Sequence, residues 1–140
     1  MGPFAASATI DAAPEEVWAV LADSAGWSTW DSGVDGVDGV LAPGNKVTIR
    51  SAVAPGRAFP VRVTRFEPGA CLELTGGMPL GLFRGVRTYR LRREGAATEV
   101  TMREEYSGPL TGLIGRSIPD LQPSFDRFVQ GLKRRVEHGR

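Results

Sequence analysis

The chain has 140 residues, of which 41% are hydrophobic and 24% are charged. These proportions are typical of a globular protein and exclude a largely disordered chain, so we expect a single domain over residues 1–140. The formal net charge of +1 is too balanced for a protein whose main task is to bind nucleic acid.

The counts of cysteine and histidine exclude further classes of protein. Cys71 and His138 are the single examples of their types, which excludes an internal disulfide and leaves too few ligands for a zinc site. We therefore expect neither a metal nor a cofactor. The sequence shows neither a secretory leader nor a run of about 18 apolar residues, so it predicts a cytoplasmic protein without an integral membrane segment.

The first predicted elements are a strand and two short helices. Residues 4–10 alternate between polar and small or apolar side chains, as a strand does. Residues 14–22 begin with a proline and two glutamates and then place apolar side chains on one face, which predicts a helix. Ser24 can cap a second short helix that would carry Trp27 and Trp30 on the same side.

A series of strands follows. The glycine-containing run at residues 33–40 is interpreted as a loose, bent strand. Later segments of alternating character are separated by short turns that contain glycine, which predicts an antiparallel meander. These predicted strands are residues 46–53, 59–66, 71–76, 83–93 and 98–107.

The C-terminal part predicts a long amphipathic helix. Apolar residues recur at spacings of three, four and seven between Leu121 and Val136. Because Pro119 and Pro123 should interrupt any helix that starts near Leu110, we expect a short helical piece to about residue 117, a break, and then the main helix.

The link at residues 94–97 predicts which side chains face the helix. If Arg93 lies opposite Thr98, one face of the hairpin pairs Tyr89 with Met102 and Arg87 with Glu104, and the other face is polar and suits water. By the same alternation, further residues should face inward: Val47, Ile49, Val53, Val61 and Val63.

Arg87 and Glu104 would then lie on an otherwise apolar surface, near the phenols of Tyr89 and Tyr106. Burying two charges is costly unless they pair, so their presence has two interpretations. They form a structural ion pair at a wet end of the sheet, or they orient a polar group of a ligand or polarise a carbonyl.

Other candidates also have two interpretations. Trp27 and Trp30 either fill the hydrophobic core or contact a ligand, and Trp30 is the better cavity candidate. The apolar run at residues 76–85 is a linking loop with buried tips or an adjustable lid. Cys71 is interpreted as a small buried filler. The lid candidates are Met78, Leu80, Leu82 and Phe83.

The order of elements resembles the SRPBCC or START-related helix-grip superfamily, and within it the bacterial polyketide cyclase/dehydrase and lipid-transport-like group. The resemblance is carried by IDAAPEEVWAVLAD at residues 10–23, GWSTWD at 26–31, the EPG turn at 67–69 and FDRFVQGLKRRVE at 125–137. It implies an α+β helix-grip fold, in which a curved antiparallel sheet of about six or seven strands wraps around the long C-terminal helix.

The resemblance also implies a cavity between sheet and helix that binds lipids, polyketides or aromatic compounds. Three functions stay open: a binding module for a hydrophobic small molecule, an aromatase, cyclase or dehydratase, and an interaction protein, monomeric or homodimeric, that docks through its apolar loop. The cavity candidates are Trp30, Val61, Val63, Arg87, Tyr89, Met102, Glu104, Tyr106, Phe125 and Phe128.

Overall fold

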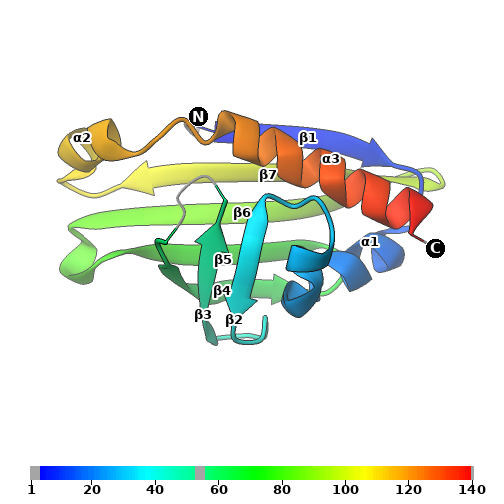
Figure 1. Cartoon of the computed structure of the whole chain (residues 1–140), viewed down its shortest axis with the longest axis horizontal. Helices are drawn as coiled ribbons and strands as arrows, with labels where there is room; N and C mark the ends of the chain where they lie inside the picture. Colours follow the sequence, from blue (N-terminus) through cyan, green and yellow to red (C-terminus); the bar gives the residue numbers. More distant parts are fainter. Residues whose placement is uncertain (1–3, 53–55, 140) are drawn as a thin grey trace.

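A computed structural model describes residues 4–52 and 56–139. Seven strands form one antiparallel sheet in the order β1-β7-β6-β5-β4-β3-β2 (Figure 1). The strands are β1 (Phe4–Ile10), β2 (Val34–Asp38), β3 (Lys46–Ser51), β4 (Phe59–Glu67), β5 (Cys71–Met78), β6 (Phe83–Glu94) and β7 (Ala97–Ser107). The helices are α1 (Pro14–Leu21), α2 (Thr111–Ile114) and α3 (Gln122–His138), with short 3-10 helices η1 (Ser24–Thr29), η2 (Pro79–Gly81) and η3 (Gly115–Ser117).

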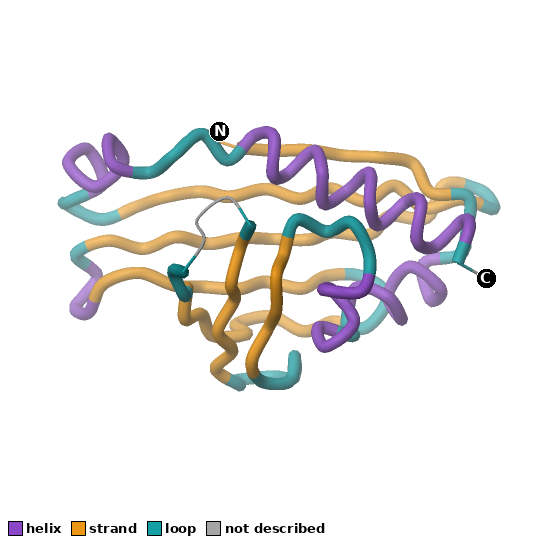
Figure 2. The backbone as a smooth tube through the Cα atoms, in the orientation of Figure 1, coloured by secondary structure: helices purple, strands orange, loops and turns teal. Residues whose placement is uncertain are grey.

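The sheet curls so that β2 and β3 cross in front of β5 and β6 (Figures 1 and 2). Irregular pairing next to Gly36 in β2 and next to Thr64 in β4 marks two bulges, which bend strands and increase their twist. Helix α3 lies along β1 on the concave side. The predicted α+β fold, a curved antiparallel sheet around a C-terminal helix with two short helices after the first strand, is confirmed.

The predicted register of the longest hairpin is also confirmed. Arg93 pairs with Thr98, Tyr89 with Met102 and Arg87 with Glu104 across β6 and β7. The outer face is polar as expected, with Arg92 bonded to Glu99 at 2.9 Å. Strand β3 ends at Ser51, and the predicted inward position Val53 lies outside the described residues.

The C-terminal region is divided as the prolines predict, with one difference. A short helical piece, α2 and η3, ends at Ser117, and a non-helical segment at residues 118–121 precedes α3. Pro123 does not interrupt the helix, because it occupies the first turn of α3, where no backbone donor is required. The interruption comes from the segment around Pro119 alone.

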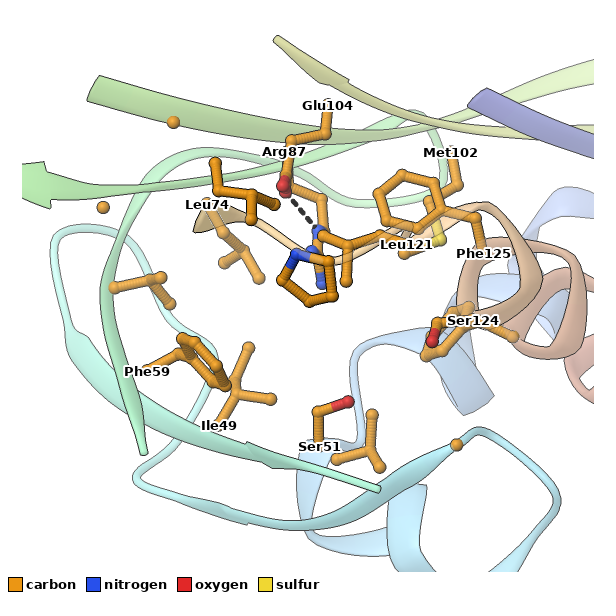
Figure 3. Close-up of a pocket in the computed structure, with 18 of the residues that line it drawn as sticks. Ile49, Ser51, Phe59, Leu74, Arg87, Met102, Glu104, Leu121, Ser124 and Phe125 are labelled. Carbon is orange, nitrogen blue, oxygen red and sulfur yellow. Dashed lines mark hydrogen bonds and ion pairs between the residues drawn. The ribbon is translucent and has the colours of Figure 1, made fainter. Parts of the chain in front are cut away.

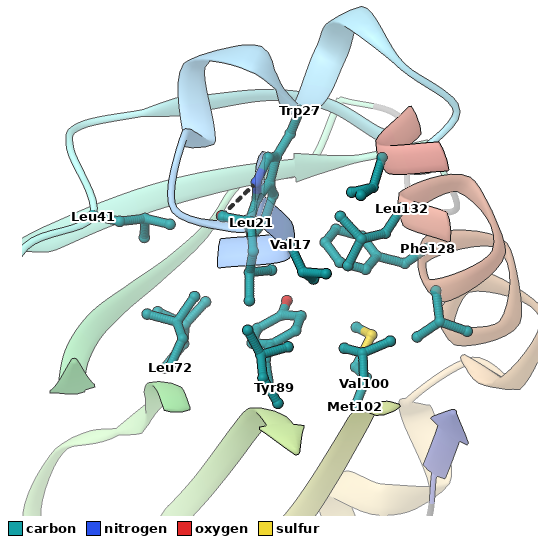
Figure 4. Packing of buried hydrophobic residues seen from close by; sticks show 14 of the residues in the cluster. Val17, Leu21, Trp27, Leu41, Leu72, Tyr89, Val100, Met102, Phe128 and Leu132 are labelled. Carbon is teal, nitrogen blue, oxygen red and sulfur yellow. Dashed lines mark hydrogen bonds between the residues drawn. The ribbon is translucent and has the colours of Figure 1, made fainter. Parts of the chain in front are cut away.

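One end of the concave face is filled with side chains. Val17 and Leu21 of α1 pack there against Leu72, Val100 and residues of α3 (Figure 4). The indole of Trp27 donates a hydrogen bond to the carbonyl of Leu21 at 2.9 Å, so the polar atom of this buried ring is satisfied. This end anchors α1, η1 and α3 on the sheet.

Candidate ligand-binding cavity

The other end of the concave face is hollow. A cavity of about 480 Å³ lies between the sheet and the N-terminal half of α3. This volume is within the range of small-molecule sites. Most of its wall is apolar, as the close-up in Figure 3 shows, and the lining includes Trp27, Val34, Ile49, Phe59, Val61, Leu74, Met102, Ile118, Leu121, Phe125 and Phe128.

The division between filled and hollow ends follows the strands residue by residue. Along β7, Val100 packs in the core, whereas Met102 and Glu104 line the cavity two and four residues later. Along β5, Leu72 is a core residue, and the inward position Gly76 faces the cavity without a side chain. Glycine therefore helps to leave space at the hollow end.

The cavity wall carries one polar cluster, made by Arg87, Glu104 and Tyr106. Arg87 Nε donates to Glu104 Oε1 at 2.7 Å, and the Tyr106 hydroxyl donates to Glu104 Oε2 (Figure 3 draws the Arg87–Glu104 bond). The Arg87 guanidinium also lies 4.8 Å from the centre of the Phe125 ring, a cation–π contact with α3. The carboxylate is thus held by a donor on each oxygen.

These contacts shift the pKa values of the groups around them. Burial alone lowers the pKa of Arg87, but the charge interactions with Tyr89 and Glu104 outweigh it and raise the pKa above the usual arginine value. Burial raises the pKa of Tyr106, and its hydrogen bond to the Glu104 carboxylate adds to this. Burial likewise raises the pKa of Tyr89. Arg87 is therefore a permanent cation, and both phenols are neutral at neutral pH.

The cavity opens to solvent between two segments. The lining residues that remain exposed are Arg57, Phe59 and Pro60 at the start of β4, Gly77 on the neighbouring strand β5, and Ser117 and Pro119 in the segment that joins α2 to α3. The opening thus lies between the start of β4 and the segment that joins α2 to α3. The non-helical segment around Pro119 forms part of its rim.

Most of the predicted cavity residues do line the cavity: Val61, Arg87, Tyr89, Met102, Glu104, Tyr106, Phe125 and Phe128. Trp30 and Val63 do not. Trp30 follows η1 in an extended conformation and packs its ring on Phe128, 5.2 Å between centres, beside a smaller pocket lined by Arg135. Trp27 lines the cavity instead. Val63 is buried in the core.

Of the four predicted lid residues, one lines the cavity and three do not. Phe83 lines the cavity and packs against Tyr106, with 5.3 Å between ring centres. Met78, Leu80 and Leu82 are absent from the lining and are exposed; Leu80 retains 96% of its accessible surface. The expectation that this loop folds inward or has buried tips is therefore wrong at Leu80, because the turn at residues 79–81 extends beyond the sheet.

The lining also includes residues that were not predicted, and two groups among them have a clear structural reason. Gly76, Gly77 and Gly85 line the cavity, although their positions in strands gave a signal for close approach or missing bulk. Ile114 and Ile118 line it from the interrupted C-terminal segment. Whether Ile114 and Ile118 reach the cavity depends on how the chain folds back after β7, and no local sequence pattern predicts that path.

Two absences concern the described residues alone. Within residues 4–52 and 56–139, no three side chains of His, Cys, Asp or Glu are grouped so that they could hold a metal ion. No helix in those same ranges combines the length and the apolar character needed to cross a membrane. Cys71 is a free, buried cysteine, and burial raises the pKa of its thiol.

The sequence matches, over residues 1–137, the family described as polyketide cyclase / dehydrase and lipid transport. The chain belongs to this family. Among proteins with curated annotation, none matches the sequence significantly.

Solved structures share the fold of this polyketide cyclase/dehydrase and lipid-transport family member at low sequence identity. DynU16, from the dynemicin biosynthetic locus, is 20% identical with a TM-score of 0.72, over 98% of this chain and 48% of that one. The di-domain ARO/CYC StfQ of the steffimycin pathway is 17% identical with a TM-score of 0.66, over 97% and 45%. The Aha1 dimer from Colwellia psychrerythraea is 17% identical with a TM-score of 0.71, over 98% and 97%. The chain thus spans about half the length of the first two proteins.

Proposed function

We propose that the protein binds a hydrophobic small molecule, a lipid, polyketide or aromatic compound, in the cavity between the sheet and α3. The observation that carries this proposal is the cavity of about 480 Å³ itself, because its mostly apolar wall is open to solvent and a hydrophobic ligand would remove that surface from water. Membership of a family described by polyketide cyclisation and lipid transport supports the same class of ligand.

The charges of the wall favour a ligand with an oxygen acceptor at one end. The charged side chains in the lining are Arg57, Arg87 and Glu104, which leaves one positive charge in excess. Glu104 is already bonded on both oxygens. A carbonyl, phenolate or carboxylate oxygen placed beside Arg87 would complete the donors of the guanidinium, while the rest of the ligand contacts the apolar wall.

A variant that narrows the cavity tests this proposal. Val61→Phe adds bulk to the wall, so the dissociation constant of the neutral fluorescent probe N-phenyl-1-naphthylamine should rise about fivefold or more. Probe fluorescence under direct excitation gives the constant, and native mass spectrometry shows any hydrophobic molecule that co-purifies.

Val40→Phe is the matched control for this experiment. It adds the same bulk at a side chain that is 69% exposed and lies outside the cavity lining, so probe binding should not change. Equal affinities for the wild type and Val61→Phe, with both proteins folded, would exclude the cavity as the binding site.

Catalysis in the same cavity is the second candidate. The hydrogen-bonded series from Arg87 through Glu104 to Tyr106 favours it, because fixed donors beside a bound carbonyl would stabilise negative charge that develops on the oxygen during an intramolecular aldol closure. Under this alternative, Glu104→Gln abolishes ring closure of a linear poly-β-ketone thioester while the fold survives. Under the binding function alone, it changes probe affinity only modestly.

A further inference from the structure

The end of the molecule beside the cavity opening exposes large apolar side chains. Met78, Leu80 and Leu82 at the β5–β6 turn are 41%, 96% and 37% exposed, and Leu113 of α2 is 68% exposed. We call these four residues the apolar tip. They include most of the large hydrophobic side chains that are exposed in the described part of the chain.

The two segments of the apolar tip are joined. The Leu110 backbone N–H donates to the carbonyl of Leu82 at 3.0 Å, which links the start of α2 to the β5–β6 turn. A Cβ atom at Gly108 would lie 2.7 Å from the Gly81 carbonyl oxygen, so glycine is needed for this close approach. The turn and α2 therefore form one surface at one end of the sheet (Figure 1).

Leu80 has an unfavourable backbone conformation that contacts of its side chain do not offset. Its φ angle is 62°, in the left-handed region that glycine enters freely and that costs a residue with a side chain. The side chain is 96% exposed, so contacts within the described structure do not offset this cost. Strain of this kind persists where another interaction requires the residue.

Within the two segments that carry the apolar tip, residues 76–86 and 106–119, the charged side chains are arginines, and acids begin at the flanking positions. The segments contain no aspartate or glutamate, and their cations, Arg84 and Arg116, are both exposed. The nearest acids along the chain outside them are Glu105, on the outer face, and Asp120. Apolar side chains flanked by arginine complement a surface that is apolar inside and negative outside.

We propose that the apolar tip docks the protein on the surface of an anionic lipid bilayer. Leu80 and its neighbours would enter the acyl boundary while Arg84 and Arg116 contact lipid phosphates. Gly77 directly precedes Met78, and Ser117 and Pro119 follow α2 in the chain; because all three line the cavity opening, docking brings the opening toward the lipid surface. The docking goes beyond the proposed ligand binding and does not depend on it.

Sedimentation with vesicles tests the docking. The protein should sediment with phosphatidylcholine vesicles that contain phosphatidylglycerol, and less with phosphatidylcholine alone or in high salt. Leu80→Gly should weaken this binding about fivefold or more. Because glycine suits the φ angle at position 80, its thermal unfolding midpoint should stay close to that of the wild type. Arg84→Gln with Arg116→Gln should remove the preference for the anionic lipid.

Two further variants separate the possible outcomes. Val40→Gly removes an exposed apolar side chain outside the tip and should leave sedimentation unchanged. Val61→Phe should weaken probe binding and keep vesicle binding, which distinguishes failure of the cavity proposal from failure of this one. Absence of sedimentation, or equal losses in Leu80→Gly and Val40→Gly, would overturn the docking. So would a dimer in light scattering that Leu80→Gly disperses, since the tip would then bind a second copy.

Discussion

Glu104 is the residue on which the polar wall of the cavity depends. It is 8% exposed and accepts hydrogen bonds from Arg87 and Tyr106, so its negative charge is compensated where water is scarce. If the carboxylate were removed, Arg87 would remain as a cation in a wall that is otherwise mostly apolar. The same pair thus has a structural role whether or not it also binds a ligand.

Glu104→Gln should therefore destabilise the protein. Because the Arg87 side chain keeps 26% of its accessible surface, we expect a loss of about 1–2 kcal/mol in the free energy of unfolding, below the value for a fully buried pair. Urea denaturation measures it. The matched control is Glu99→Gln on the outer face of the same hairpin, where the partner Arg92 is 69% accessible and the loss should stay below about 0.5 kcal/mol. Equal losses would show that the inner pair is solvated like the outer one.

The two tyrosines of the chain, Tyr89 and Tyr106, predict a dependence of stability on alkaline pH. Both phenols have raised pKa values in the folded protein, mainly because they are buried. A raised pKa means that the unfolded chain loses these protons first, so their effect on stability is constant below pH about 10 and becomes unfavourable above it. The tyrosinate absorbance should appear above pH about 10 and coincide with loss of structure by circular dichroism. A folded protein that titrates near pH 10 would contradict this.

At the scale of elements, α3 is held close to the turn after η1. A Cβ atom added to Gly131 would lie 1.9 Å from the Asp31 carbonyl oxygen, so the helix backbone and this turn touch directly. The Asp31 carboxylate accepts hydrogen bonds from Arg127 and Arg134 at 2.7 and 2.9 Å, and the bond from Arg127 lowers its pKa. This contact fixes the position of α3 and hence the width of the cavity.

Gly131→Ala should destabilise the protein by about 2 kcal/mol or more, although alanine is the better helix former. The clash is with backbone, and no side chain can rotate to relieve it. Gly112→Ala in α2 is the control, since nothing lies within 4 Å of its added Cβ, and it should be neutral or slightly stabilising. Thermal unfolding of both variants checks this; a neutral Gly131→Ala would mean that α3 can move away from the turn.

Local patterns predict some elements better than others. The β6–β7 hairpin was predictable to the residue, because inward and outward side chains alternate and the turn at Gly95 fixes the register. The placement of the tryptophans was not. Trp27 and Trp30 differ in position because η1 ends between them and Trp30 is extended, and helical spacing cannot show where a helix of so few residues ends.

For the whole molecule, alternation along the strands predicts most of the cavity wall, whereas the cavity itself was expected from the family resemblance and not from any local pattern. The wall follows from the alternation of Arg87, Tyr89, Met102 and Glu104 along two paired strands. The space depends on the curl of the sheet, on glycines and on the path of residues 118–121, which are set by contacts between distant parts of the chain. The exposure of Leu80 was missed for a different reason: apolar character alone predicts burial.

The separation of the concave face into a packed end and a hollow end has an evolutionary consequence. Residues such as Ile10, Leu72 and Val136 maintain the packed end and are absent from the cavity lining. Substitutions at lining residues outside the core cluster, such as Phe59, Ile114 and Ile118, can therefore accumulate without loss of the scaffold. Descendants of one such gene can acquire new ligand specificities while they keep the same packed end of the fold. Sequence divergence should therefore concentrate in the cavity lining.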